Sequence, residues 1–287
     1  MGLFQTMRSA SVALSSFQIA SEIAGDNVAN VQTEGYVRQK VVLQENPAYP
    51  TPFGNIGTGV TVKEVKRIID IFVENQIEKE MSIKTFWQEK TNYYQLIEKI
   101  LQEPSETNLN NAFNDFWSAL GDLTVTPESS SLREQVLNVT QILIDRFHYI
   151  SQRLKDQRSY LNYNISQIVK DINLLAQQLS KINEKIITYP TFERVSNELK
   201  NKQELIIKKM SELFRINVVR NEDGTVNVYI GGDPLVMKDR YFEIESIPDM
   251  GGNYYLYWKL TGNLINFTSG KVKSWFDLRD IIIPSYL

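Results

Sequence analysis

The chain has 287 residues, 42% of them hydrophobic, with a formal net charge of −3 and no cysteine. This hydrophobic content is ordinary for a protein that buries a core, and the small net charge provides no strong field to attract nucleic acid. The absence of cysteine excludes disulfides, thiol nucleophiles and cysteine-based zinc sites.

The N-terminal stretch, residues 1–32, predicts a helix with one apolar stripe. Its apolar and small residues recur in steps of four and three: Leu3, Met7, Ala10, Leu14, Phe17, Ser21, Ala24 and Val28. Such a heptad stripe is typical of a helix that packs along another helix. The polar face is thin, so neighbours should enclose the helix. The stripe either docks on this chain's own core or waits for other subunits, and the pattern alone leaves both interpretations open.

Residues 33–67 predict an extended connector that can form a hairpin. Helix-ending and turn residues lie at its start, and two stretches rich in β-branched residues follow, Tyr36 to Leu43 and Gly59 to Val65. Prolines and glycines fill the interval between these two strands.

Residues 68–214 predict a domain of long helices. We expect helices over residues 69–101, 108–123, 132–187 and 197–214. In the third, apolar residues recur at steps of three or four with one skip, at Arg158. A helix of that length is a rod of about 80 Å, which fibres, bundles and scaffolds use more often than enzymes do.

Residues 215–268 predict a small β region, and residues 269–287 the start of a returning helix. Asp223-Gly224 is a strong hairpin turn signal, Gly231 to Pro234 indicates another turn, and two further strands are expected at 241–247 and 254–260. The fold class is therefore mainly α with a smaller β part: a bundle of long helices plus short antiparallel strands.

No motif predicts catalysis, a cofactor or a metal ion. His148 is the only histidine and lies in the long helical pattern, without partners for a catalytic triad. Gly54, Gly57 and Gly59 do not form a dinucleotide-binding fingerprint, and Asp223-Gly224 lacks the remaining ligands of a calcium loop. No apolar run reaches the ~20 residues of a membrane span, so we expect no membrane insertion.

The stretch from Ala24 to Gln39, AGDNVANVQTEGYVRQ, resembles the N-terminal motif of flagellar rod, hook and hook-associated proteins, N-[IV]-A-N-x-x-T-x-G-Y-x-R-Q. Its ending is similar to that of the hook-associated protein 1 (FlgK) family. The motif positions are Asn27, Asn30, Thr33, Gly35, Tyr36, Arg38 and Gln39.

Two other stretches strengthen this resemblance. Gly57 to Val60 resembles the G-x-G-V of the family, and residues 269–287 resemble its S-G…R-D-x-I-I-P-x-Y-L stretch. Residues 197–203 depart from the family's acidic and basic pattern. In the family the chain continues into a long C-terminal helix that pairs with the N-terminal one, and the resemblance implies that this segment is missing here.

The resemblance implies an extracellular structural subunit that passes unfolded through the flagellar type III export apparatus. It would form a ring with copies of itself between hook and filament, in contact with hook protein and the second junction protein. No cofactor and no nucleic acid are implied. The subunit-interface residues in the inner tube would be Leu3, Met7, Leu14, Phe17, Ala24 and Val28.

Three alternatives remain. Another axial subunit of hook or rod is disfavoured by the long helix, because hook proteins are mostly β outside their terminal helices. A secreted helical adhesin or effector would need an exposed apolar patch away from the N-terminal stripe. An enzyme would need a catalytic carboxylate pair, and none stands out.

Overall fold

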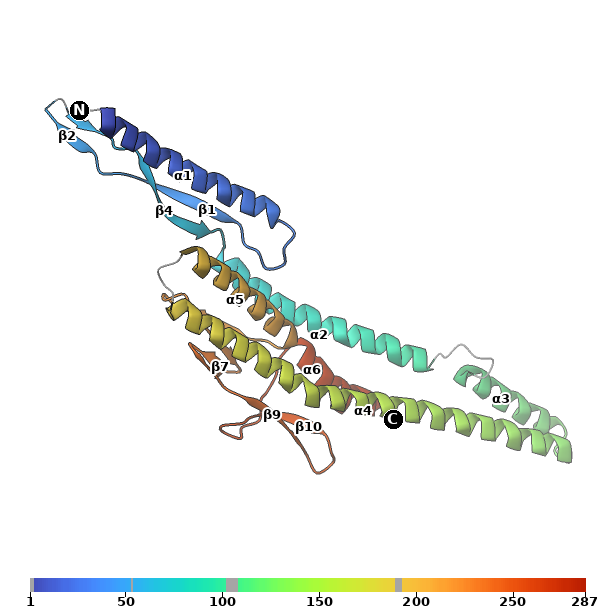
Figure 1. The fold of residues 1–287 in the computed structure, drawn as a ribbon. Helices are drawn as coiled ribbons and strands as arrows, with labels where there is room; N and C mark the ends of the chain where they lie inside the picture. Colours follow the sequence, from blue (N-terminus) through green and yellow to red (C-terminus); the bar gives the residue numbers. More distant parts are fainter. Residues whose placement is uncertain (1–2, 53, 102–107, 189–192) are drawn as a thin grey trace. The chain divides into compact units, whose positions relative to one another are not determined.

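The computed structural model describes residues 3–52, 54–101, 108–188 and 193–287 (Figure 1). The chain is mainly α with a smaller β part, which confirms the predicted fold class. It forms two compact units, each assembled from separate stretches of sequence. Unit 1 comprises Met1–Glu80, Leu174–Ser211 and Ile216–Phe242; unit 2 comprises Met81–Asn173, Glu212–Arg215 and Glu243–Leu287.

In unit 1, helix α1 (Leu3–Ala29) lies along a hairpin of strands β1 (Gln39–Glu45) and β4 (Val60–Arg67) (Figure 1). The two strands are antiparallel, with a β-bulge between Val42 and Leu43. Strands β2 (Tyr49–Thr51) and β3 (Gly54–Ile56) form a small second hairpin within the connection, which the sequence did not predict. The predicted connector is thus an ordered hairpin that carries α1.

The rest of unit 1 contains the beginning of α2 (Ile71–Leu101), the end of α4 (Ser130–Thr188), helix α5 (Glu193–Leu213) and a four-stranded antiparallel sheet. The sheet runs in the order β5 (Asn217–Arg220), β6 (Val226–Ile230), β7 (Asp233–Met237), β8 (Arg240–Tyr241). The fully buried core residues of this part of unit 1, on α4, α5 and the sheet, are Leu179, Ile207, Met210, Val228, Leu235 and Val236. The expected turn at Gly231 to Pro234 ends earlier than predicted, because Pro234 already belongs to β7, at a register irregularity opposite Tyr229. Proline is tolerated in a strand at such a site, where a ladder hydrogen bond is already disrupted.

Unit 2 contains the remainder of α2 and α4, helix α3 (Leu109–Val125), a hairpin of β9 (Ile244–Pro248) and β10 (Tyr254–Trp258), and helix α6 (Gly270–Asp277). The predicted returning helix is not continuous. After α6 the chain forms a π-helical turn (Leu278–Ile282) and then a 3-10 turn (Ile283–Tyr286). The fully buried core residues of this unit include Leu154, Leu161, Ile165, Ile172, Phe214, Leu256, Val272 and Leu278.

Helix α4 is a single helix of 59 residues, as the apolar period predicts. Three of its asparagines attach strand backbone to it. Asn173 donates from Nδ2 to the carbonyl of Ile244 and accepts from the same residue's amide, and Asn183 does the same with Val226. Asn162 accepts from the amide of Tyr254 and donates to a hairpin carbonyl. The sequence pattern does not reveal these contacts, because an isolated asparagine in a helix usually faces solvent.

Candidate assembly site

One face of α1 docks on this chain's own hairpin. Ile23 is buried, and Ser16 Oγ donates to the carbonyl of Val60 across 3.2 Å. At Gly59 an added Cβ would lie 3.2 Å from the carbonyl oxygen of Ser9, so the helix and β4 approach closely here. Part of the helix is therefore held by its own unit.

The opposite face carries the predicted interface residues, and it is exposed. Met7, Leu14, Phe17 and Val28 are 59%, 63%, 59% and 75% exposed, and Ala24 is exposed too. The side chain of Leu3 lies outside the described side chains. Two apolar residues outside the predicted interface set are also exposed: Phe4, 86% exposed on the same helix, and Val31, 77% exposed just after it. Contiguous exposed apolar surface of this kind is uncommon on a folded unit whose opposite face is docked.

The motif after α1 closes a turn through the side chain of Asn27. Its Nδ2 donates to the carbonyl of Gln39 at 2.8 Å, and its Oδ1 accepts from the Gln39 amide at 2.9 Å and from the Tyr36 hydroxyl at 3.0 Å. One amide thus holds the start of β1 against the end of α1. The motif residues Asn27, Tyr36 and Gln39 are brought together as a structural clasp.

The other motif residues shape the same turn. Asn30 Nδ2 donates to the carbonyl of Asp26, and Thr33 Oγ1 donates to Asn30 Oδ1. Gly35 adopts a φ of +78°, and an added Cβ there would lie 3.2 Å from Leu205 Cβ of α5. Arg38 has an exposed side chain, and its carbonyl accepts from the Ile68 amide. Gln39 contributes its main chain to the turn, while its side-chain oxygen accepts from Asn197 Nδ2 of α5 at 3.3 Å.

We expect Asn27→Ala to loosen this clasp. The substitution leaves the amide and carbonyl of Gln39 without their partner, a loss of about 1–3 kcal/mol. Exchange of the Gln39 amide hydrogen, measured by mass spectrometry or NMR, should therefore accelerate about tenfold or more. Gln32→Ala, at an exposed position of the same turn, is the control and should leave that rate unchanged. Unchanged exchange in Asn27→Ala would show that the backbone alone fixes the turn.

A buried ion cluster in unit 1 joins α2, α5 and β5. Arg220 donates to Glu78 at 2.6 Å, to Glu204 at 2.9 Å and to the side-chain carbonyl of Asn75 at 2.6 Å. Burial raises the pKa of Glu78 although Arg220 opposes the shift. Burial alone would lower the pKa of Arg220, but hydrogen bonds and charge from Glu204 and Glu78 raise it. The cluster stabilises contacts between elements and does not resemble a proton-transfer site.

The raised pKa of Glu78 predicts an unusual pH dependence. Because the folded state binds this proton at higher pH than the unfolded state, the contribution of Glu78 to unfolding free energy rises as pH falls through its folded pKa. It is complete below the unfolded value of about 4.3. The free-energy difference between wild type and Glu78→Gln should therefore grow in favour of wild type from pH 7 to about pH 4.

Hydrogen-exchange protection of the Val226 amide in unit 1, corrected for intrinsic exchange, would measure that difference. Glu80→Gln is the matched control for loss of one negative charge, since Glu80 is an exposed carboxylate on the same helix. A difference that shrinks on acidification would show that the ion pair with Arg220 outweighs the burial of Glu78.

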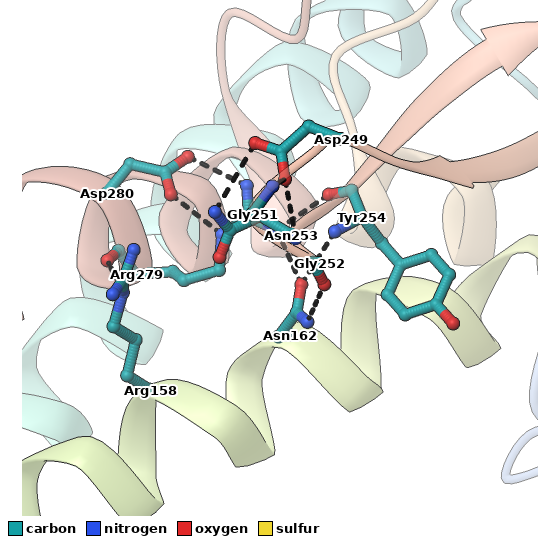
Figure 2. Close-up of polar contacts among 9 residues, drawn as sticks. All are labelled: Arg158, Asn162, Asp249, Gly251, Gly252, Asn253, Tyr254, Arg279 and Asp280. Carbon is teal, nitrogen blue, oxygen red and sulfur yellow. Dashed lines mark hydrogen bonds and ion pairs between the residues drawn. The ribbon is translucent and has the colours of Figure 1, made fainter.

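In unit 2, Arg279 is fully buried at the π-helical turn (Figure 2). Nε and Nη2 donate to both carboxylate oxygens of Asp280 at 2.7 and 2.8 Å, while Nη1 donates to Asn162 Oδ1 at 2.9 Å and to the Tyr254 carbonyl at 2.6 Å. The guanidinium also lies 4.8 Å from the ring centroid of Tyr255. One side chain thus fastens the C-terminal turn to both α4 and the β9–β10 hairpin.

Arg158 explains the skip in the apolar period of α4. Its Nε donates to the main-chain carbonyl of Arg279 at 3.2 Å (Figure 2). The break in the apolar stripe therefore marks the position where α4 contacts the π-helical turn. The sequence showed the break but not its partner, which lies 121 residues away in the chain.

Within the described ranges, no cluster of three or more His, Asp or Glu side chains has a geometry suited to a metal ion. Nor does any helix in that part of the chain have the length and apolarity to cross a membrane.

Two family models match parts of this chain. Residues 94–287 match the family described as the helical domain of the flagellar hook-associated protein FlgK, and residues 7–36 match one described as flagella basal body rod protein. Flagellar hook-associated protein 1 of Bacillus subtilis (strain 168) is 32% identical over 228 residues, 77% of this chain and 45% of that protein. The protein of the same name from Escherichia coli (strain K12) is 25% identical over 240 residues, 82% of this chain and 43% of that protein.

A solved structure, the flagellar hook junction protein FlgK from Burkholderia pseudomallei, has a similar fold with a TM-score of 0.59. Its sequence is 18% identical to this chain, and the matched region covers 72% of this chain and 38% of the solved chain. The chain spans less than half the length of the relatives it matches. Since a family model covers well over half of it and a relative 32% identical covers 77% of it, the chain belongs to the FlgK family of flagellar hook-associated proteins.

Proposed function

We propose that this chain is a structural part of the junction between flagellar hook and filament, with no enzymatic activity. The observation that carries the proposal is the exposed apolar face of α1, which its own unit leaves uncovered although the other face of the helix is docked. Copies of the chain would pack these faces together in a ring. Hook protein and the second junction protein would lie on either side of the ring.

Export follows from the same proposal. A subunit outside the cell has to pass the flagellar export apparatus, and a chain without cysteine cannot form a wrong disulfide after it leaves the cytoplasm. The long helices and the small sheets would build the outer shells of the ring, while α1 and its hairpin would lie toward the inner tube.

The test is the double substitution Leu14→Glu with Phe17→Glu, introduced into the chromosome of the bacterium that encodes the chain. Both side chains are about 60% exposed, so stability of the isolated chain should change by no more than about 0.5 kcal/mol per site. Assembly should fail, because two carboxylates would have to be buried in the subunit contact. We expect loss of swimming on soft agar and hooks without filaments in electron micrographs.

Gln18→Glu is the matched control, since it adds a carboxylate at an exposed position of α1 beside the apolar face. This variant should swim. Normal swimming of the double variant, with its folded state intact by circular dichroism, would contradict the proposed role of α1. A variant that fails to swim because it unfolds is identified by the same circular dichroism measurement.

A further inference from the structure

A pocket of about 390 Å³ lies in unit 1 beside the turn that follows α1. Its lining includes the carboxylates of Asp26, Glu34 and Glu198 against a single lysine, Lys202, which pairs with Glu198 at 2.7 Å. The pocket therefore carries an excess of negative charge and favours a cationic occupant.

Asn201 provides a second, independent indication. Its side chain lines the same pocket and the residue is only 9% exposed, yet no described donor reaches Oδ1. A buried acceptor without a hydrogen bond costs about 1–3 kcal/mol. A lysine ammonium has three N–H donors and no acceptor, so it could bond to Asn201 Oδ1 and to a carboxylate at once.

The cation that fits is present on the hairpin of the same unit. Lys40 of β1 and Lys66 of β4 are directly opposite each other, and both are exposed. Neither lysine has an ion-pair partner among the described residues. Two like charges facing each other across strands are destabilising, so this pair of lysines also favours an anionic partner.

These lysines do not reach their own pocket. Gln39 lines the pocket and Lys40 follows it in β1. Successive side chains of a strand point to opposite faces, so Lys40 is directed away from the pocket that Gln39 lines. A second copy of the chain can present the lysines instead.

We propose that the Lys40–Lys66 pair of one copy binds the acidic pocket, formed by Glu34, Glu198 and Asn201, of the next copy. The inference rests on the proposed ring assembly and assigns one of its contacts. Because the two surfaces differ, the contact is heterologous, the kind that propagates from subunit to subunit and forms a ring when the rotation between subunits closes.

Zero-length carbodiimide cross-linking tests this contact, because it joins amines and carboxylates only when they touch. Equal amounts of unlabelled and ¹⁵N-labelled chain are cross-linked over a range of concentrations and digested for mass spectrometry. We expect mixed-isotope links between Lys40 or Lys66 and Glu34 or Glu198. Their yield should fall at least tenfold in Lys40→Glu with Lys66→Glu, and equally in Glu34→Lys with Glu198→Lys.

Mixing the two charge-reversed variants should restore links of both polarities, because each variant keeps one wild-type surface. The links of reversed polarity join the two mutated surfaces, and they would not form if either variant merely had a structural defect. Lys63→Glu, on the same hairpin and exposed, is the control and should leave the links unchanged. Links confined to other lysines, or no recovery on mixing, would overturn the contact. Such a failure beside an immotile Leu14→Glu, Phe17→Glu strain would leave the proposed function standing.

Discussion

Gly270→Ala is expected to produce the largest loss of stability of any conservative substitution in unit 2. The residue has a φ of +88°, and an added Cβ would lie 2.5 Å from Phe214 Cα and 2.6 Å from the Leu213 carbonyl oxygen. These are backbone atoms, so relief requires α6 to separate from the end of α5. We expect a loss of about 4 kcal/mol, the upper range of overpacking combined with strain.

The measurement is urea unfolding followed by tryptophan fluorescence. All four tryptophans, Trp87, Trp117, Trp258 and Trp275, belong to unit 2, so this signal reports on that unit alone. Gly262→Ala is the matched control: φ is +69° but nothing lies within 4 Å of the new Cβ. Its free energy of unfolding should fall by only about 1–2 kcal/mol, the cost of a left-handed backbone conformation for alanine. Equal losses in the two variants would show that close approach at Gly270 is unimportant.

Arg279→Met is expected to destabilise unit 2 by about 3 kcal/mol, because it leaves the Tyr254 carbonyl and the Asp280 carboxylate without their buried donor. Asn162 Oδ1 keeps only its bond from the Tyr254 amide. Arg279→Lys keeps the charge but loses the planar fork that bonds both oxygens of Asp280. It should recover only part of the loss. Tryptophan fluorescence during urea unfolding measures both variants.

Arg215→Met is the control, since Arg215 is an exposed arginine of the same unit. A change within about 0.5 kcal/mol is expected there. If Arg279→Met were as stable as wild type, methionine packing against Tyr255 and Phe276 would have replaced the network, as hydrophobic substitutes for buried ion pairs sometimes do.

The helices could be predicted because their signal is local. The apolar period placed α4 within a few residues of its observed ends, and the motif after Val28 placed the end of α1. The short strands could not be predicted in the same way. Strands β2 and β3 have three residues each, too few to show an alternation, and β7 contains a proline that ordinarily argues against a strand.

The candidate site was only partly predictable for a related reason. Helix α1 carries two interleaved stripes, one through Leu14 and Phe17 and one through Ser16 and Ile23, and both have heptad spacing. Periodicity alone does not tell which stripe docks on the chain's own hairpin. The polar networks could not be predicted from the sequence, because their partners are distant in it: Arg220 and Asn75 are separated by 145 positions.

The three asparagines of α4 make this helix intolerant of insertions while leaving the strands free to vary. Each amide bonds to main-chain groups, which every residue type except proline offers in full. Substitutions in β6, β9 and β10 therefore keep these attachments. An extra residue in α4 would instead rotate every following side chain by about 100° and remove Asn173 or Asn183 from its strand. Natural variation in this part of the chain should accordingly consist of substitutions in the strands, with the length of the helix between Asn162 and Asn183 unchanged.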